Sequence, residues 1–307
     1  MKYVYIVNPV SGKKNAEKTL VPEIHEYFKD KDLDYEVVLT ERPHHATELA
    51  RSCASSGDEV RICSCGGDGT LNEVVEGVVG HDNVELSCYS CGGGNDFVKS
   101  FGSVSDFRRV ATLVEGDSVP VDVLTVNDRY CINILSVGLD ADISEAVIKY
   151  RKVKFLRGPG AYNLAMLECV FLKPMGKDFT VELDGKEPYS NSFTLVVAGN
   201  GRVYGGSYRA TPEAKVDDGI IDIVSIKKLS LPKVAKLISK YKAGVHIKDG
   251  VIIDELVDKM EYYKTAKFKI SAQNEFVVNI DGERIRTDCI QVGIIRHALK
   301  FIVPDLG

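Results

Sequence analysis

The chain has 307 residues, of which 44% are hydrophobic and 27% charged, and its formal net charge is −5. This length is long for one core and suits two domains of about 100–200 residues each, and the composition is typical of globular proteins. The negative balance gives no overall attraction to nucleic acid or anionic membrane, so we expect no nucleic-acid partner, and any membrane contact requires a local basic patch.

The first third of the chain alternates between two kinds of hydrophobic pattern. Short apolar runs are followed by turns and then by apolar side chains at helical spacing. Such alternation with short links predicts an α/β domain with a mostly parallel sheet covered by helices on both faces. The expected strands are 2–7, 34–40, 59–65 and 84–90, and the expected helices are 15–30, 45–56 and 70–80.

From about residue 119 the segments are short, rich in Val, Ile, Phe and Thr, and several are separated by turns such as Asp184-Gly185. Many strands with such turns predict a β-rich, sandwich-like second domain. The expected strands are 119–126, 129–137, 179–184, 192–199, 220–227, 267–271, 276–280 and 289–295, interrupted by helices at 142–173 and 231–243.

We place the domains at 1–122 plus 298–307 and at 123–297, because the apolar tail after residue 297 is suited to pack on the first domain. The apolar run in the first ten residues is too short for a secretory signal, because Asn8-Pro9 stops it, and no apolar stretch reaches the about 20 residues of a spanning helix. We therefore expect a cytoplasmic protein with reduced thiols. Cys63 and Cys65 are one residue short of Cys-x-x-Cys spacing, so we interpret them as buried hydrophobes rather than zinc ligands.

The strongest chemical signal is the sequence GGDGTLNE at residues 66–73, which follows an apolar strand and opens an amphipathic helix. Glycines let the backbone approach a phosphate, and a helix start offers free N–H groups and a partial positive charge. Asp68 adds a carboxylate suited to holding Mg²⁺ through water or to acting on a hydroxyl. An ordinary turn with Thr70 as helix cap is the simpler alternative, but this pattern is more particular than that.

Two further turns follow expected strands, NPVSGK at residues 8–13 and CGGGNDF at residues 91–97. The carboxyl ends of parallel strands lie at one edge of a sheet, which is where open α/β sheets bind ligands. We therefore expect three phosphate-sized loops side by side. The chain has no Walker A sequence, no G-x-G-x-x-G loop and no H-R-D loop.

These motifs resemble those of the diacylglycerol kinase catalytic family, which includes sphingosine and ceramide kinases and bacterial lipid kinases, and whose GGDG loop is shared more distantly with NAD kinases. Gly205-Gly206 with Pro212, Asp217-Asp218-Gly219 and Asp281-Gly282-Glu283 resemble the signatures of its second domain. The resemblance covers essentially the whole chain. It implies an ATP-binding α/β domain, a β-rich lipid-binding domain, and an active site in the cleft between them.

The resemblance also implies nucleotide contacts. Family members usually carry Thr in the third loop, where this chain has Gly93, so we expect only a backbone contact there. The implied ATP-binding residues are Asn8, Ser11, Thr40, Gly66, Gly67, Asp68, Gly69, Thr70, Leu71, Asn72 and Gly93.

Phosphoryl transfer needs in-line positioning, neutralisation of charge by Mg²⁺, and a carboxylate that takes the hydroxyl proton. Glu283 is the first candidate for this catalytic base and Asp68 the second. Taken without the family, Glu283 is a solvated turn residue beside Arg284.

A second Mg²⁺ site is implied at the turn 217–219. A side-chain oxygen of Asp218 and the main-chain carbonyls of Lys215 and Ile220 suit a hard cation whose shell is completed by water. The simpler alternative is an Asp-Asp-Gly β-turn. Asp96 and Asp122 are candidates to extend the carboxylate network around Asp68.

Two basic stretches, 149–157 and 227–242, mix Lys and Arg with apolar residues. Such faces suit transient peripheral docking on a membrane that presents the lipid substrate, although a solvated helix face explains them too. No residue pattern specifies an oligomer, and a homodimer stays open.

The resulting hypothesis is an ATP-dependent kinase that phosphorylates a hydroxyl of diacylglycerol or a related lipid in phospholipid metabolism. The alternatives are a GGDG kinase for a soluble substrate such as NAD and a non-catalytic nucleotide-binding regulator. The sequence does not name the lipid, because chain specificity depends on the volume of the binding site.

Overall fold

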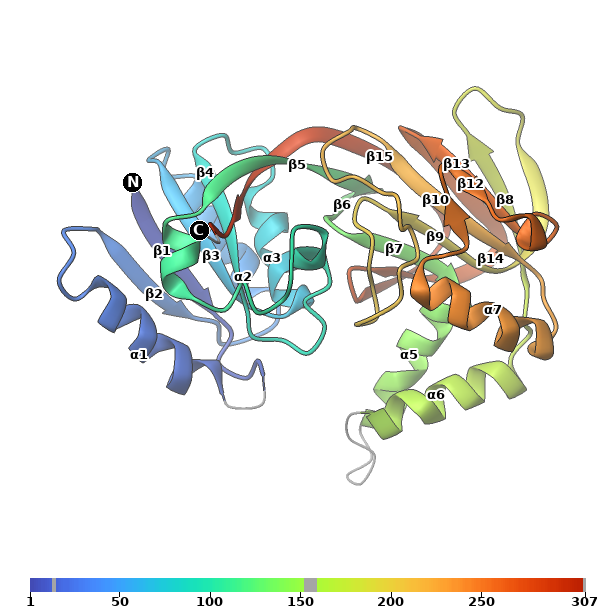
Figure 1. Ribbon diagram of the computed structural model, residues 1–307, viewed down its shortest axis with the longest axis horizontal. Helices are drawn as coiled ribbons and strands as arrows, with labels where there is room; N and C mark the ends of the chain where they lie inside the picture. The colour runs from blue at the N-terminus through green and yellow to red at the C-terminus, as the bar shows by residue number, and fades with distance from the viewer. Residues whose placement is uncertain (13–14, 152–158, 306–307) are drawn as a thin grey trace. The chain divides into compact units, whose positions relative to one another are not determined.

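The computed structural model describes residues 1–12, 15–151 and 159–305. The chain forms two compact units (Figure 1). Unit 1 comprises Met1–Val123, Val216–Gly219 and Ile295–Gly307, and unit 2 comprises Leu124–Lys215 and Ile220–Ile294. The short segment Val216–Gly219 thus belongs to unit 1, although the residues on both sides of it belong to unit 2.

Unit 1 is the predicted parallel α/β layer structure. Its strands pair in the order β2-β1-β3-β4, all parallel, and the end of the last strand of the chain, β15, adds to β4 through Lys300 and Phe301. The apolar tail therefore returns to the first domain, as expected. The strands are β1 (Lys2–Val7), β2 (Tyr35–Leu39), β3 (Val60–Gly66), β4 (Val84–Ser90) and β15 (Glu283–Val303).

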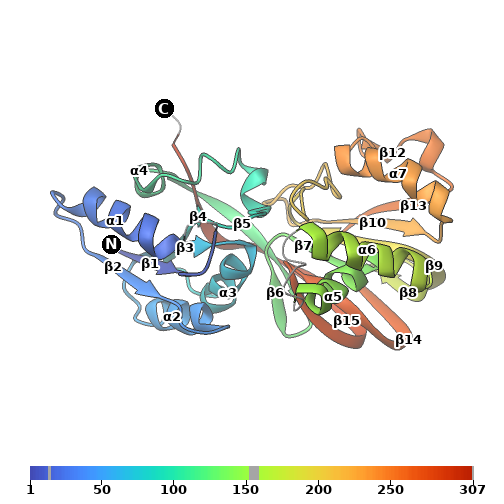
Figure 2. The ribbon, with the colours of Figure 1, turned by 90° about the horizontal axis from the view of Figure 1, so that it is seen from below.

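Helices cover both faces of this sheet. Figure 2 shows α1 and α4 on one face and α2 and α3 on the other. Because both faces are covered, β3 is buried almost throughout, which explains its unbroken apolar sequence. The helices are α1 (Ala16–Phe28), α2 (His45–Ala54), α3 (Asp68–Val78) and α4 (Val110–Val114), with a short 3₁₀ helix at Phe97–Ser100.

Unit 2 is built from antiparallel strands. Strand β7 pairs with β9 and β14, and β8 pairs with the same two strands, so these four strands close into a ring around one hydrophobic core. Strands β10 and β13 extend the sheet beyond β9. The strands are the end of β5 (Asp117–Val126), which crosses from unit 1 into unit 2 after Val123, and β6 (Arg129–Cys131), β7 (Ile134–Gly138), β8 (Lys177–Leu183), β9 (Tyr189–Gly199), β10 (Ile221–Lys227), β13 (Met260–Thr265) and β14 (Lys267–Ile280), with a small hairpin of β11 (Ile247–Lys248) and β12 (Val251–Ile252).

Three helices pack on the strands of unit 2. Helix α7 (Leu231–Ala243) matches the predicted range, and it ends at Gly244 in the left-handed conformation that glycine favours. Instead of one helix at 142–173 there are two, α5 (Leu139–Arg151) and α6 (Pro159–Leu172), which contact each other. Leu237 and Tyr241 of α7 join a second core cluster.

Several predicted boundaries were wrong for physical reasons. Helix α3 begins at Asp68 with Gly67 as its cap, and not at Thr70. The predicted strand 129–137 is two strands, because the backbone between them turns to donate hydrogen bonds to Asp281. The predicted strands 267–271 and 276–280 are one strand, β14, with an irregularity in its register. Within the described ranges, no helix is long and apolar enough to cross a bilayer.

The contact between α2 and α3 generates a prediction about stability. A Cβ atom on Gly77 would lie 2.6 Å from the carbonyl oxygen of Thr47 and 2.8 Å from the Cβ of Ala50. We expect Gly77→Val to force the helices apart and lower the free energy of unfolding by about 2 kcal/mol or more. Urea unfolding followed by circular dichroism measures this. Gly93→Val is the control, since no atom lies within 4 Å of a Cβ there; equal midpoints for the two variants would contradict the packing argument.

Candidate active site

Three loops meet at the carboxyl edge of the unit 1 sheet. The N–H groups of Cys91 and Gly92 donate to the carbonyl of Gly66 at 2.8 and 3.0 Å. The N–H of Asn8 donates to the carbonyl of Cys65 at 3.0 Å. The structure therefore brings the first, third and fourth strand ends together, as the sequence predicted for the three motifs.

Glycines make this approach close. A Cβ on Gly92 would lie 2.5 Å from the Cα of Gly67, and one on Gly12 would lie 2.7 Å from the carbonyl oxygen of Cys91. A Cβ on Gly66 would collide with the side chain of Thr70. No side chain fits at these positions, so a bare backbone lines the edge where α3 begins. The first N–H groups of a helix have no partner inside it, which makes this edge suited to an anion.

Asp68 fastens the third loop to the start of α3. Its Oδ2 accepts a hydrogen bond from the N–H of Asn95 at 2.8 Å, and its Oδ1 accepts one from the N–H of Asp96 at 2.5 Å. Asp96 in turn pairs with Lys99 at 2.6 Å. Because both carboxylate oxygens bind backbone N–H groups, Asp68 positions the glycine-rich loop. Its part in catalysis stays a prediction.

The other predicted nucleotide residues lie around this edge. The Nδ2 of Asn8 donates to the Oγ1 of Thr70 at 3.1 Å, which joins the first loop to α3. Ser11 follows in the same loop, and Thr40 lies just beyond β2, with its N–H bonded to the carbonyl of Val7. Leu71 and Asn72 have buried side chains, so contacts with a ligand there would use the backbone. Gly69 lies in the first turn of α3, and Gly93 is surrounded by open space.

Asp122 is fully buried and fastens a different turn. Its Oδ2 accepts from the N–H of Gly219 at 2.6 Å, and its Oδ1 accepts from the N–H of His297 at 2.7 Å. This explains why Val216–Gly219 belongs to unit 1. The carboxylate therefore holds the Asp217-Asp218-Gly219 turn, whereas the sequence suggested a place near Asp68. Of the predicted Mg²⁺ ligands, Asp218 lies on this turn and Lys215 and Ile220 flank it; their binding of a metal stays a prediction.

The Asp281-Gly282 turn connects β14 to β15 in unit 2. Both residues have positive φ, 49° and 96°, as the tight turn of a two-residue hairpin requires. The carboxylate of Asp281 accepts hydrogen bonds from three successive N–H groups, those of residues 132–134, at 2.7–3.1 Å. Burial raises the pKa of Asp281, and these hydrogen bonds act against that shift. The hairpin is thereby locked to the loop before β7.

Glu283 is the first residue after this turn and is half-buried. Its neighbour Arg284 donates to the carbonyl of Ser144 at 3.1 Å, so the two side chains are not paired. Among the residues that the structure describes, no hydrogen bond or ion pair engages the Glu283 carboxylate. It is therefore available to a substrate. Asp68 belongs to unit 1 and Glu283 to unit 2, and each is placed within its own unit.

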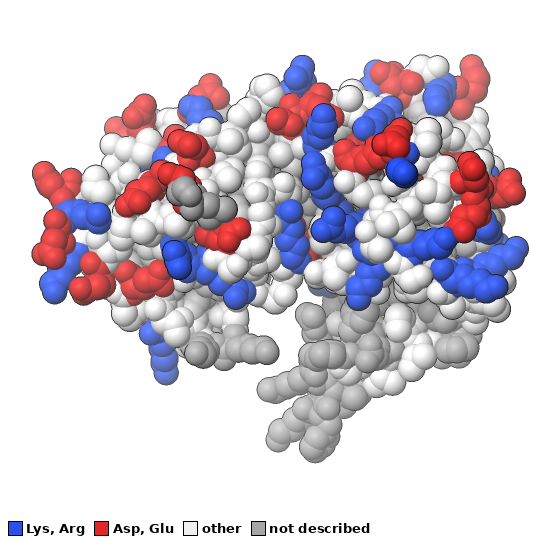
Figure 3. Space-filling model, in the orientation of Figure 1, with Lys and Arg blue, Asp and Glu red and all other residues white. Residues whose placement is uncertain are grey.

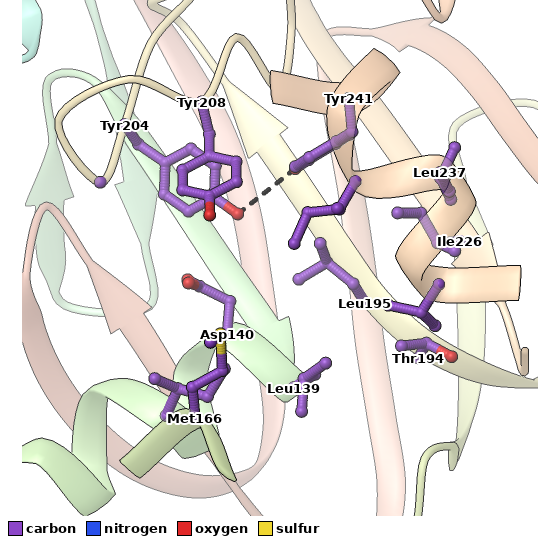
Figure 4. Close-up of a pocket in the computed structure, with 14 residues that line it drawn as sticks. Leu139, Asp140, Met166, Thr194, Leu195, Tyr204, Tyr208, Ile226, Leu237 and Tyr241 are labelled. Carbon is purple, nitrogen blue, oxygen red and sulfur yellow. Dashed lines mark hydrogen bonds between the residues drawn. The ribbon is translucent and has the colours of Figure 1, made fainter. Parts of the chain in front are cut away.

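Unit 2 also holds an apolar pocket with a cavity of about 120 Å³ (Figure 4). Helix α7 closes one side of it, and the start of α5 and Met166 of α6 close another. One lining residue, Ile238, is 39% exposed, so the lining of the pocket reaches the molecular surface at α7. The lining residues are Leu139, Asp140, Ile143, Met166, Thr194, Leu195, Tyr204, Gly205, Tyr208, Ile226, Val234, Leu237, Ile238 and Tyr241.

Basic side chains gather over α7 (Figure 3). Lys233, Lys236 and Lys242 are exposed on this helix, and Lys240 pairs with Glu255. Helix α7 carries no acidic residue. The other basic stretch, 149–157, lies mostly outside the described residues.

Sequence reasoning missed the pocket and the anchoring roles of Asp122 and Asp281. The pocket combines residues from α5, α6, α7, β9 and β10, and no local pattern connects these segments. The Asp281-Gly282 pair predicted the turn, but the sequence did not predict which N–H groups bind the carboxylate of Asp281. The four cysteines near the sheet edge are free thiols, and Cys63, Cys65 and Cys88 are buried, as expected.

Comparison with known proteins gives the same picture for both halves. Residues 2–126 match the family model of the diacylglycerol kinase catalytic domain, and residues 133–303 match the YegS C-terminal NAD kinase beta sandwich-like domain. The chain is 28% identical to a diacylglycerol kinase of Staphylococcus carnosus and 29% identical to one of Bacillus subtilis. The two alignments each cover 91% of this chain, and they cover 87% and 88% of those proteins.

Solved structures share the fold. A diacylglycerol kinase of Bacillus anthracis superposes with a TM-score of 0.70 at 22% identity, over 99% of this chain and 97% of that one. Yeast NADH kinase superposes with a TM-score of 0.50 at 11% identity, over 98% of this chain and 82% of that one. The two-domain architecture is therefore that of these kinases.

The anchoring role of Asp281 is testable by substitution. Asp281→Ala leaves several buried N–H groups without an acceptor, at about 1–3 kcal/mol for each group. We expect a loss of at least about 3 kcal/mol in the free energy of unfolding and faster hydrogen exchange at the amides of residues 132–134. Asp288→Ala removes an exposed carboxylate from the same strand and is the control. Unchanged exchange at the three amides would show that the carboxylate does not hold them.

Proposed function

We propose that this chain, which belongs to the diacylglycerol kinase family and is a lipid kinase, uses ATP to phosphorylate the hydroxyl of diacylglycerol or a closely related lipid. The observation that carries the proposal is the apolar pocket of unit 2 in a chain that also has a glycine-lined helix start in unit 1. A pocket lined by aliphatic and aromatic side chains suits a hydrocarbon chain, and it disfavours a soluble substrate such as NAD.

We propose that the backbone of residues 66–70 holds the phosphates of ATP, which supplies the phosphoryl group. The close approach of Gly67 and Gly92 leaves room for phosphate oxygens against main-chain N–H groups. Asp68 supports this loop through its two backbone hydrogen bonds. These features favour binding of an anion over binding of a neutral group.

We propose that Mg²⁺ is the counter-ion, with a structural site at the Asp218 turn. An all-oxygen donor set from a carboxylate and two carbonyls suits this hard cation. The turn is already fixed by Asp122, through the hydrogen bond from Gly219, so its donors are held in place.

We propose that Glu283 takes the proton of the lipid hydroxyl. The hydroxyl becomes a better nucleophile as its proton moves to the carboxylate. The rigid hairpin and the anchored Asp281 keep Glu283 in a fixed position, while its carboxylate has no competing partner among the described residues.

We also propose that the protein meets its lipid at a membrane surface through α7. Exposed lysines attract anionic headgroups, and the lining of the pocket reaches the surface beside them at Ile238. Contact of this kind is peripheral and weakens as salt concentration rises.

The activity is tested with labelled ATP, Mg²⁺ and mixed micelles that contain single lipids. We expect label in a lipid product with the wild-type protein, and a loss of about 10²–10⁴-fold in kcat with Glu283→Gln, because the amide cannot accept the proton. Glu182→Gln, which changes a partly exposed carboxylate elsewhere in unit 2, is the control. If no lipid is labelled by folded, ATP-binding protein, the function is wrong. A loss below tenfold would move the base to Asp68.

The third loop yields a prediction about nucleotide affinity. The family pattern carries Thr where this chain has Gly93, and a Cβ at this position meets no atom within 4 Å. We expect Gly93→Thr to fold normally and to tighten ATP binding by about 2- to 10-fold, the worth of one hydrogen bond. Isothermal titration with ATP measures this. Gly92→Thr is the counterpart, because its Cβ would clash with Gly67, and it should weaken binding; similar behaviour of the two variants would argue against this geometry.

A further inference from the structure

Among the 14 residues that line the apolar pocket, only Asp140 carries an acidic side chain, and none is basic. Asp140 lies in the first turn of α5. The Oγ of Ser136 donates to its Oδ2 at 2.6 Å, and the Nδ2 of Asn279 approaches the same oxygen at 3.4 Å. The other oxygen, Oδ1, receives no hydrogen bond from the described part of the chain. One half of the carboxylate is therefore held by the protein, and the other half is left for a ligand.

Figure 4 shows the Asp140 carboxyl directed toward the hydroxyl ends of Tyr204 and Tyr208 across the pocket. The hydroxyls of Tyr204 and Tyr241 are hydrogen-bonded to each other at 3.3 Å. The pocket thus has a polar end, formed by a carboxylate and tyrosine hydroxyls, and an apolar end, formed by Leu139, Leu195 and the aliphatic residues of α7. This division matches a molecule with a polar head and a hydrocarbon tail.

In the protein without a ligand, a carboxylate in this apolar pocket lowers the stability of the fold, because its charge is poorly solvated. Burial raises the pKa of Asp140, and the hydrogen bonds from Ser136 and Asn279 oppose the shift. The folded chain holds this proton more tightly than the unfolded chain, so stability is lost as the pH rises from the unfolded pKa through the folded pKa. If Asp140 had only a structural role, an uncharged side chain would make the protein more stable. A carboxylate that lowers stability and faces a pocket indicates a role in ligand binding.

The polar end of the pocket is connected to the hairpin that carries Glu283. Asn279, which approaches Asp140, lies on β14 opposite Arg284, and the next pair along the ladder is Ile280 with Glu283. Successive side chains of a strand point to opposite faces, so Asn279 faces Asp140 while the neighbouring pair of Ile280 and Glu283 faces the other side of the hairpin.

We propose that Asp140 is a specificity-determining residue that selects a single-chain lipid with a second hydrogen-bond donor, a hydroxyl or an ammonium group, besides the hydroxyl that is phosphorylated. This inference rests on the proposed lipid kinase function. A monoacylglycerol or a long-chain amino alcohol has such a donor. Diacylglycerol has one hydroxyl only, and it must be given to the phosphoryl group. With diacylglycerol bound, Oδ1 of Asp140 would stay unpaired.

The size of the pocket supports one chain. A cavity of about 120 Å³ is similar to the engineered apolar cavities of about 150 Å³ that hold one benzene molecule. It accepts one hydrocarbon segment, and the rest of a longer chain leaves where the lining reaches the surface at Ile238. The cavity itself has no room for a second acyl chain beside the first.

The test compares three lipids in the same detergent micelles at equal mole fraction: 1-monooleoylglycerol, sphingosine and 1,2-dioleoylglycerol. We expect kcat/KM of the wild-type protein to be about 10- to 100-fold higher for at least one of the first two than for dioleoylglycerol, the range of one hydrogen bond to a charged group. Asp140→Asn should remove most of this preference by lowering kcat/KM for the preferred lipid more than for dioleoylglycerol. The first two lipids distinguish a hydroxyl donor from an ammonium donor.

Glu145→Gln is the matched control, because Glu145 lies on the same helix and pairs with Arg286 outside the pocket. It should leave the order of the lipids unchanged. Thermal unfolding at pH 8 shows whether Asp140→Asn folds, and we expect a midpoint no lower than that of the wild type, since the buried charge is gone. Isothermal titration with monodecanoylglycerol in the absence of ATP gives a readout independent of catalysis, and Asp140→Asn should bind it at least tenfold more weakly.

The outcomes separate this inference from the proposed function. If dioleoylglycerol is phosphorylated as well as the other lipids, or if Asp140→Asn lowers all three rates equally, the inference is overturned and the lipid kinase stands. If no lipid is phosphorylated but monodecanoylglycerol binds in a manner that requires Asp140, the proposed function fails and the ligand preference of the pocket is supported. A variant with a lower unfolding midpoint and unchanged lipid preference would assign Asp140 a structural role.

Discussion

The close contact between Gly67 and Gly92 is the constraint on which the loop edge of the unit 1 sheet depends, where we propose that the nucleotide binds. With side chains at these positions, the loops after β3 and β4 could not approach, and the carbonyl of Gly66 could not accept hydrogen bonds from both Cys91 and Gly92. The gap that glycine leaves is bounded by main-chain groups and by the start of α3. Phosphate recognition by a helix start requires such a surface, because only the backbone brings N–H groups near enough to an anion.

Three carboxylates accept hydrogen bonds from backbone N–H groups in the loops of this fold. Irregular segments that are needed for binding leave N–H groups without partners in a sheet or helix, and an unsatisfied buried N–H is costly. Asp68 binds two such groups in the third loop, Asp122 binds those of Gly219 and His297, and Asp281 binds three before β7. Each acid fixes an irregular turn from within its own unit. The charges therefore serve as anchors, and Glu283 differs from them in having its carboxylate left available.

Asp140 in unit 2 differs from these anchoring acids. Asp140 is held by one oxygen and faces an apolar pocket with the other, although a carboxylate loses solvation there. The ring of strands β7, β8, β9 and β14 gives a rigid core behind the pocket, and α7 covers it from the side that carries exposed lysines. Under the proposed function, this site offers an apolar surface for the lipid tail, a carboxylate for a donor on the lipid head, and lysines on the side facing the membrane. Each property comes from a different segment of the chain.

Strand and helix positions, the change of architecture near residue 120 and the three loops at one sheet edge followed from local patterns in the sequence, because period, turn residues and glycine spacing are local properties. The tertiary structure decided the rest. It made 129–137 two strands, since Asp281, far along the chain, captures the N–H groups between them. It moved Val216–Gly219 into unit 1 through Asp122. It formed the pocket from helices and strands that no pattern connects, and it left one oxygen of Asp140 facing that pocket. The sequence alone determined which chemical groups the protein has. Their partners depend on contacts between residues distant in the chain, so only the folded structure determines which of them are anchors and which are free to bind a ligand.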